Sequence, residues 1–252
     1  MTTSPKSWLL DLGNSRLKLA PLLPSGQRGD LSAIENAQPD AEAVLLRQLA
    51  PIGAGDVAWL ASVASAEKTA AVTAALQAGG IAVQPVQTRA QCAELRIAYL
   101  LPAQLGVDRF LALLAASERG GGPWLLVSAG SALTVDLLAD DGQHLGGLIA
   151  PMPAHQRAVL AQNFSQLDVP EGRAREFADN TADAIASGAR TAVLGLVERS
   201  LRVARAQLGV SPGVLLSGGG ADLFADLDHA RVLRVESPVL DGLAVFARQR
   251  ES

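Results

Sequence analysis

A short polar segment near the N-terminus has the residue types that bind phosphate. It reads D-L-G-N-S at residues 11–15, follows an apolar run and precedes Lys18. A glycine turn at a strand end lets backbone N–H groups approach phosphate oxygens, and Asn14 and Ser15 add side-chain donors. Asp11 could hold Mg²⁺ through water, and Lys18 could add a compact positive charge. Taken alone, however, such a segment is more often an ordinary hairpin turn.

A related segment, S-A-G-S-A, recurs at residues 128–132. It shares with residues 11–15 the order of strand, glycine and small polar residue, which indicates two related halves of the chain. Two such hairpins facing each other across a cleft could clamp a triphosphate from both sides. A plain turn explains the second segment about equally well.

The segment G-V-D-R at residues 106–109 opens an apolar helical pattern. The carboxylate of Asp108 could accept a hydroxyl proton, and the guanidinium of Arg109 could bind a substrate carboxylate through two hydrogen bonds. An isolated Asp in this place more commonly caps a helix. Tyr99, the only tyrosine, lies just upstream and could line a pocket or belong to the core.

A fourth segment, S-G-G-G at residues 217–220, matches neither G-x-G-x-x-G nor a Walker loop. It could lie against an adenine or ribose, but a tight strand-to-helix turn is its commoner role.

The elements that must position these segments alternate between strands and helices, which favours an α/β fold with sheets covered by helices. Residues 21–40 are expected as loop, and a glycine-proline break at 120–123 suggests two lobes, residues 1–119 and 120–252. Expected strands occupy 7–12, 16–20, 56–63, 81–86, 124–127, 133–138, 144–150 and 213–216, and expected helices occupy 67–78, 107–118, 181–207 and 239–248.

Composition narrows the class of protein. The chain has 252 residues, 49% of them hydrophobic, and a net charge of −4. The acidic balance argues against nucleic-acid binding, and no apolar run is long enough for a membrane span. With one cysteine (Cys92) and three dispersed histidines, we expect neither a disulfide framework nor a metal-ligand cluster. The cysteine content also predicts a reducing cytoplasmic location.

Taken together, six motifs resemble those of the type III pantothenate kinases, which belong to the actin-like, sugar-kinase-type (ribonuclease H-like) superfamily of two-lobed ATP-using folds. In chain order they are D-L-G-N-S at 11–15, Tyr99, G-V-D-R at 106–109, G-S-A-L-T-V-D at 130–136, H-L-G-G-L-I-A-P at 144–151 and N-T-A-D-A-I-A-S-G at 180–188. The resemblance implies two related α/β lobes with mixed sheets, and an enzyme that phosphorylates pantothenate with ATP and Mg²⁺ in the first step of coenzyme A synthesis.

The resemblance also implies roles for individual residues. Asp108 would accept the proton of the pantothenate hydroxyl. Thr181 would complete the pocket of a partner subunit, which implies a homodimer. The nucleotide phosphates would contact Asp11, Leu12, Gly13, Asn14, Ser15, Arg16, Leu17, Lys18 and Ser131, and pantothenate would contact Tyr99, Gly106, Val107, Asp108, Arg109 and Thr181.

One residue departs from the family pattern. The family usually has Asp at the position of Ser128, where it helps to bind K⁺ or NH₄⁺, so a monovalent-cation site here would lack its formal anion. Two other functions remain open: a non-catalytic transcriptional accessory protein on the same fold, and a phosphatase acting on polyphosphate-like substrates. The acidic charge disfavours the phosphatase, because a long polyanion needs a basic channel.

Overall fold

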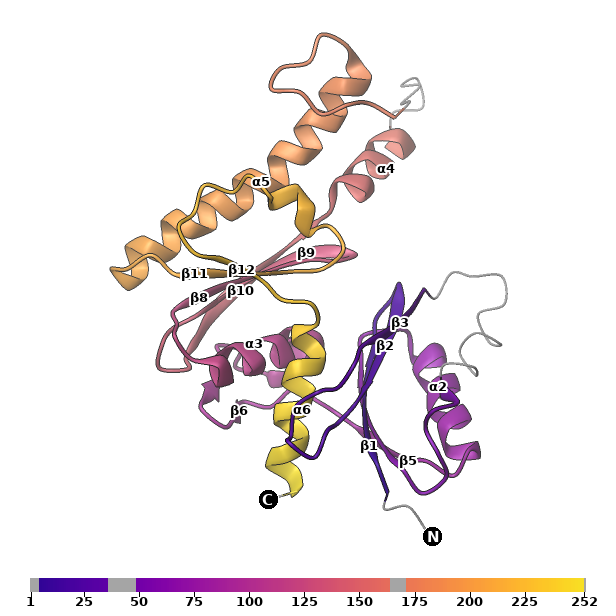
Figure 1. The fold of residues 1–252 in the computed structure, drawn as a ribbon. Coiled ribbons are helices and arrows are strands. Elements are labelled where there is room, and N and C mark those ends of the chain that lie inside the picture. The colour runs from indigo at the N-terminus through magenta and orange to yellow at the C-terminus, as the bar shows by residue number, and fades with distance from the viewer. Residues whose placement is uncertain (1–4, 36–48, 164–170, 252) are drawn as a thin grey trace. The chain divides into compact units, whose positions relative to one another are not determined.

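The computed structural model describes residues 5–35, 49–163 and 171–251, which fold into two compact units (Figure 1). The described residues up to Gly120, together with Asp141–His144 and the segment from Ser237 onward, form the first unit. Gly121–Asp140 and Leu145–Glu236 form the second unit. Each unit contains one five-stranded mixed sheet with helices packed on it.

The sheet of the first unit has the strand order β3-β2-β1-β4-β5. Strand β1 pairs antiparallel with β2 and parallel with β4; β2–β3 is antiparallel and β4–β5 parallel. Leu10 and Leu12 pack in the same core as Val72 and Leu76 of helix α2. Because side chains alternate along a strand, Asp11 lies on the opposite face. The bounds are β1 Ser7–Leu12, β2 Arg16–Pro21, β3 Ser32–Glu35, β4 Val57–Ser62, β5 Ala82–Pro85 and α2 Ala66–Ala78.

Two helices cover the face of this sheet that α2 leaves free, α3 (Val107–Arg119) and α6 (Pro238–Glu251) (Figure 1). Phe246 of α6 meets Trp59 of β4 and Phe110 of α3 edge-on, with ring centroids 6.3 Å apart in both pairs. The two helices pack very closely at Gly242, where any Cβ would overlap the carbonyl of Leu111.

The second sheet repeats the strand order of the first, as β10-β9-β8-β11-β12. Strand β8 pairs antiparallel with β9 and parallel with β11, as β1 does with β2 and β4. Val193 and Val197 of helix α5 pack in its core, and helix α4 lies beside α5 (Figure 1). The bounds are β8 Trp124–Ala129, β9 Ala132–Leu138, β10 His144–Pro151, β11 Gly213–Ser217, β12 Val232–Arg234, α4 Pro153–Asn163 and α5 Thr181–Leu208. The shared order confirms the two related α/β folds expected from the repeated glycine segments.

The two glycine hairpins occupy equivalent places in their sheets. In the first, Leu12 pairs with Leu17 and Asp11 with Lys18; in the second, Ala129 pairs with Leu133 and Ser128 with Thr134. The ion pair of the first sheet therefore corresponds to two hydroxyl side chains in the second. Neither Gly13 nor Asn14 has the positive φ expected for a Gly-Asn turn, since a longer connection closes the hairpin between β1 and β2.

The C-terminal helix α6 belongs to the first unit, whereas the sequence places it in a lobe of residues 120–252. The difference has a physical cause: α6 packs on α3 and on strands β1, β2 and β4. Such long-range packing leaves no mark on the local sequence pattern, which shows only where a helix begins and ends.

Most of the expected elements are found, and the missed ones are short or weakly patterned. Residues 21–40, expected as loop, contain β3. A small hairpin of β6 (Gln91–Cys92) and β7 (Leu95–Arg96), the strand β12, helix α4, and the 3₁₀ turns η1 (Pro102–Gln104) and η2 (Ala221–Phe224) were not expected. The glycine loop after β11 leads into η2. In the described part of the chain, no helix is both long and apolar enough to cross a bilayer.

Candidate active site

The first unit brings an ion pair to the start of its first hairpin. Asp11 lies near the end of β1 and its cross-strand partner Lys18 lies on β2, with Lys18 Nζ 3.9 Å from Asp11 Oδ2. Asp11 is buried and Lys18 is partly exposed. Of the predicted phosphate segment, Asn14 and Ser15 are exposed in the turn that follows, and Arg16 is exposed at the start of β2. A positive side chain thus lies beside donors that a phosphate can reach.

The carboxylate of Asp11 has an unusual electrostatic environment. Burial raises the pKa of Asp11 to about 6, the Lys18 ammonium opposes this rise, and the nearby Asp108 carboxylate adds to it. A buried anion with only partial compensation favours the approach of a cation. A Mg²⁺ ion carried by a nucleotide, held through water, fits this carboxylate.

Asp108 lies in the first turn of α3, where the helix dipole stabilises a negative charge. Its Oδ1 accepts a hydrogen bond from the backbone N–H of Arg109 at 2.8 Å. The helix is capped by Gly106 without a side-chain hydrogen bond, so Asp108 is not the N-cap residue. Because its charge also acts on Asp11, the structure brings together two carboxylates that lie far apart in the sequence.

Gly106 leaves room for the Asp108 side chain. A Cβ at position 106 would lie 2.6 Å from Asp108 Oδ1, although the backbone there (φ −52, ψ 137) suits any residue. We expect Gly106→Ala to turn the carboxylate aside and to lower kcat by about 10²-fold, as a misplacement of roughly 1 Å does. Steady-state kinetics and a thermal melt test this expectation.

Gly53→Ala is the matched control, because a Cβ there meets Asp56 Oδ2 at an ordinary 3.8 Å. That variant should keep its kcat. If Gly106→Ala also kept it, Asp108 would not need its present rotamer for catalysis.

Arg109 is buried in the first turn of α3, where the helix dipole disfavours a positive charge. Its Nη1 donates to the hydroxyl of Tyr99 at 3.2 Å, and its Cζ lies 5.8 Å from the centre of the Tyr99 ring. A buried guanidinium at an unfavourable helix end suggests a role in binding an anion rather than in stability.

Two of the predicted residues belong to the second unit. Ser131 is exposed in the turn between β8 and β9, and Thr181 is the exposed first residue of α5. Thr181 helps to line an open pocket of about 720 Å³ between α4 and α5. The loop before it is held to the helix: Asp183 accepts from Arg173 N at 2.7 Å and from Arg175 Nε at 2.9 Å.

The predicted site residues therefore fall into two groups. Asp11, Lys18, Tyr99, Asp108 and Arg109 share the first unit and interact in part, whereas Ser131 and Thr181 are each placed within the second unit only. The described residues contain no group of three or more His, Cys, Asp or Glu suited to a metal ion.

His144 is a buried residue for which the sequence predicted no role. It is completely buried, and its ring is stacked on Tyr99 with centroids 6.1 Å apart and planes 8° from parallel. In the sequence, His144 is marked only by its position at the start of the H-L-G-G-L-I-A-P motif. That position does not reveal its contact with Tyr99.

Solved structures share the overall fold of this chain. A candidate Baf family transcriptional activator from Campylobacter jejuni matches with a TM-score of 0.63 and 16% identity, over 97% of this chain and 98% of that one. A candidate 2-dehydro-3-deoxygalactonokinase from Sinorhizobium meliloti matches with a TM-score of 0.52 and 19% identity, over 96% of each chain. At these identities the likeness concerns the fold alone, which is the two-lobed actin-like, sugar-kinase fold.

Sequence comparison identifies the family within this class. The family model described as type III pantothenate kinase matches residues 8–203. The type III pantothenate kinase of Stenotrophomonas maltophilia (strain K279a) is 45% identical, over 95% of this chain and 96% of its own length. That of Xanthomonas axonopodis pv. citri (strain 306) is 43% identical, over 97% and 98%. The chain belongs to the type III pantothenate kinase family, which makes it a phosphotransferase and disfavours the transcriptional alternative.

Proposed function

We propose that Asp108 is the general base of an ATP-dependent phosphorylation of pantothenate, the first step of coenzyme A synthesis. The pantothenate hydroxyl oxygen attacks the γ-phosphorus of ATP, the bond from that phosphorus to ADP breaks, and Asp108 accepts the hydroxyl proton. Phosphoryl transfer asks a protein mainly for positioning and charge neutralisation, so this base is needed only late in the reaction. The observation that carries the proposal is the place of Asp108 in the first turn of α3, where Arg109 N–H holds its carboxylate at 2.8 Å and its charge acts on the Asp11 carboxylate.

The first hairpin supplies the phosphate-binding groups. Lys18 and the exposed turn donors neutralise and orient the phosphates, and Asp11 attracts the Mg²⁺ of the nucleotide. Mg²⁺, when bound, neutralises charge that develops on the transferred group. Ser131 is a further candidate phosphate contact from the equivalent turn of the second sheet.

Arg109 binds the carboxylate of pantothenate. Its guanidinium is buried, always charged and oriented by Tyr99, which suits two parallel hydrogen bonds to a carboxylate. Gly106 and Val107 complete this segment at the start of α3.

A homodimer would complete the pantothenate pocket. Thr181 lies beside an open pocket of its own unit, and Phe177, just before it, is 97% exposed. Because aromatic side chains are enriched at protein–protein interfaces, the exposed Phe177 supports this assembly. A cytoplasmic location, where ATP is available, accords with the unpaired thiol of Cys92.

The monovalent-cation site stays a prediction, and in this chain it would lack a negatively charged ligand at position 128. Ser128 is half-buried on β8, between Thr134 and Ser217 of the neighbouring strands. Hydroxyl and carbonyl oxygens can bind K⁺ or NH₄⁺, but here they do so without the usual Asp.

Coupled measurement of ADP release, with and without pantothenate, tests this function. We expect turnover that requires both ATP and pantothenate, and a particle of twice the chain mass of 26.0 kDa by sedimentation. Added K⁺ and NH₄⁺ are varied separately. An absence of pantothenate-stimulated ADP release with either cation would contradict the proposal.

A further inference from the structure

A turn from between the strands of the second sheet is built into the first unit. Residues 141–143 lie between β9 and β10 and His144 begins β10, yet all four belong to the first unit, where they meet the small β6–β7 hairpin. Gly142 lies against the backbone of Glu94 with φ +80, and a Cβ there would come within 2.3 Å of the Glu94 carbonyl oxygen. Only glycine fits such a contact, so the turn is docked tightly.

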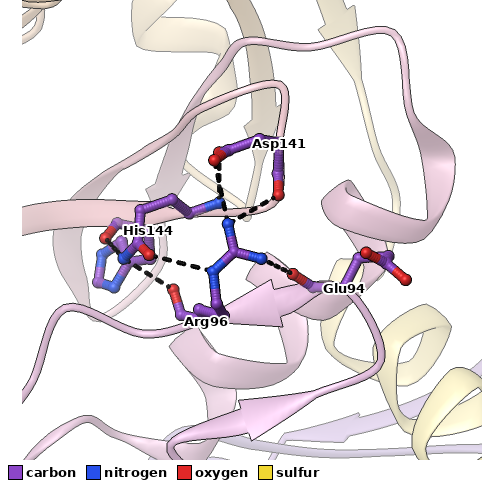
Figure 2. Close-up of polar contacts among 5 residues, drawn as sticks. Glu94, Arg96, Asp141 and His144 are labelled. Atoms are coloured by element: carbon purple, nitrogen blue, oxygen red, sulfur yellow. Dashed lines mark hydrogen bonds and ion pairs between the residues drawn. The ribbon is translucent and has the colours of Figure 1, made fainter.

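Arg96 of β7 holds this turn through several hydrogen bonds (Figure 2). Its Nη2 donates to the carbonyl of Asp141 at 3.1 Å and to Asp141 Oδ2 at 3.0 Å, and its backbone N–H donates to the Gly142 carbonyl at 3.0 Å. Gln143 Nε2 donates to the carbonyls of Arg96, at 3.2 Å, and His144, at 2.8 Å. The bonds to backbone carbonyls fix the path of the chain as it enters His144.

His144 ends this docked turn and is completely buried. Its Nδ1 accepts a hydrogen bond from the backbone N–H of Ala98 at 3.4 Å, and its ring stacks on Tyr99, the next residue. The Tyr99 hydroxyl in turn accepts from Arg109 at 3.2 Å. A continuous series of contacts therefore leads from the turn through His144 and Tyr99 to Arg109.

We infer that His144 is a positioning residue for pantothenate: its ring holds Tyr99 in the orientation that places the Arg109 guanidinium. This inference rests on the proposed function, in which Arg109 binds the substrate carboxylate. A buried Arg has many rotamers, and fixing one before the substrate arrives lowers the entropy cost of binding. His144 acts on substrate affinity, with no contact to the reacting atoms.

The test compares His144→Ala with the native enzyme in steady-state assays that vary pantothenate and ATP separately. Loss of the stacked ring should raise the pantothenate KM by about tenfold and leave kcat and the ATP KM within about twofold, the pattern of lost binding that is equal in ground and transition states. His229→Ala is the matched control, because the His229 ring likewise has a backbone hydrogen-bond partner, the Pro212 carbonyl at 2.7 Å, but lies in the second unit. It should keep both KM values.

Two further variants keep the test decisive if the alanine protein folds poorly. His144→Gln retains an acceptor for Ala98 N–H without a ring and should show the raised pantothenate KM. His144→Phe retains a flat ring and should stay within about threefold of the native value. A pantothenate KM that is raised in His144→Phe but native in His144→Gln would overturn the inference, because the hydrogen bond and not the stacking would then matter.

A double-mutant cycle with Tyr99→Phe separates positioning from a general structural role. Without the Tyr99 hydroxyl, His144 loses its path to Arg109, so His144→Ala should then raise the pantothenate KM by less than about threefold. An equal rise in both backgrounds, or equal rises in the pantothenate and ATP KM values, would overturn the inference. If the native enzyme shows no turnover of pantothenate, the proposed function fails instead.

Discussion

Asp108→Asn is expected to lower kcat by about 10²- to 10⁴-fold, the usual contribution of a general base. The amide oxygen of Asn can still accept the hydrogen bond from Arg109 N–H that holds the native side chain at 2.8 Å. The fold and the shape of the site should therefore be retained, while the ability to take a proton is lost. ADP release at saturating ATP and pantothenate measures the effect.

Two controls accompany this variant. The KM for each substrate should change by less than about threefold, since the replacement is isosteric, and the thermal midpoint should stay close to the native one. A kcat within about tenfold of native would mean that Asp108 is not the base. A non-catalytic regulator would keep its role in this variant, so the same protein also tests the transcriptional alternative.

The second large effect is expected at Asp11. Its folded pKa of about 6 lies above the ordinary value of 3.8, so ionisation of Asp11 opposes folding. The stabilising effect of the protonated form is fully present below about pH 4 and is lost as the pH rises through about 6, and well above pH 6 the loss amounts to about 3 kcal/mol. Asp11→Asn has no such loss, so its stability relative to the native protein should rise between pH 4 and pH 7. Denaturant melts at both pH values measure this difference.

Asp11→Asn should lower the activity, although it raises the relative stability. If the ionised Asp11 attracts the Mg²⁺ of the nucleotide, Asp11→Asn should lower kcat/KM for ATP by about 10²-fold at pH 8, where the native carboxylate is charged. In the native enzyme, kcat/KM for ATP should fall as the pH drops through about 6, since this ratio reports groups of the free enzyme.

Asp108→Asn offers an internal check on this pH profile. Because the Asp108 charge contributes to the raised pKa of Asp11, its removal should shift the acidic limb of the profile to lower pH. A native profile that is flat between pH 5 and pH 8, or an Asp11→Asn enzyme with native kcat/KM, would contradict the role assigned to Asp11.

Local sequence patterns predicted most of the elements that carry the site. The strand–glycine–polar segments at 11–15 and 128–132 predicted two equivalent hairpins, and the register confirms that Asp11 and Ser128 correspond. The start of α3 at Val107 was likewise predicted, because an apolar face at helical spacing begins there. These features depend on residues that lie near one another in the chain, which is why a sequence can reveal them.

The tertiary structure alone decided how these segments act on one another. The raised pKa of Asp11 arises from burial and from Asp108, which is distant in the sequence. The stacking of His144 on Tyr99 arises because a turn between β9 and β10 docks on β7. The return of α6 to the first unit depends on its close packing with α3 at Gly242. By itself the sequence determined which groups are available for chemistry and where the chain turns. Burial, charge coupling and ring contacts between distant segments exist only in the folded chain, because they depend on packing in three dimensions.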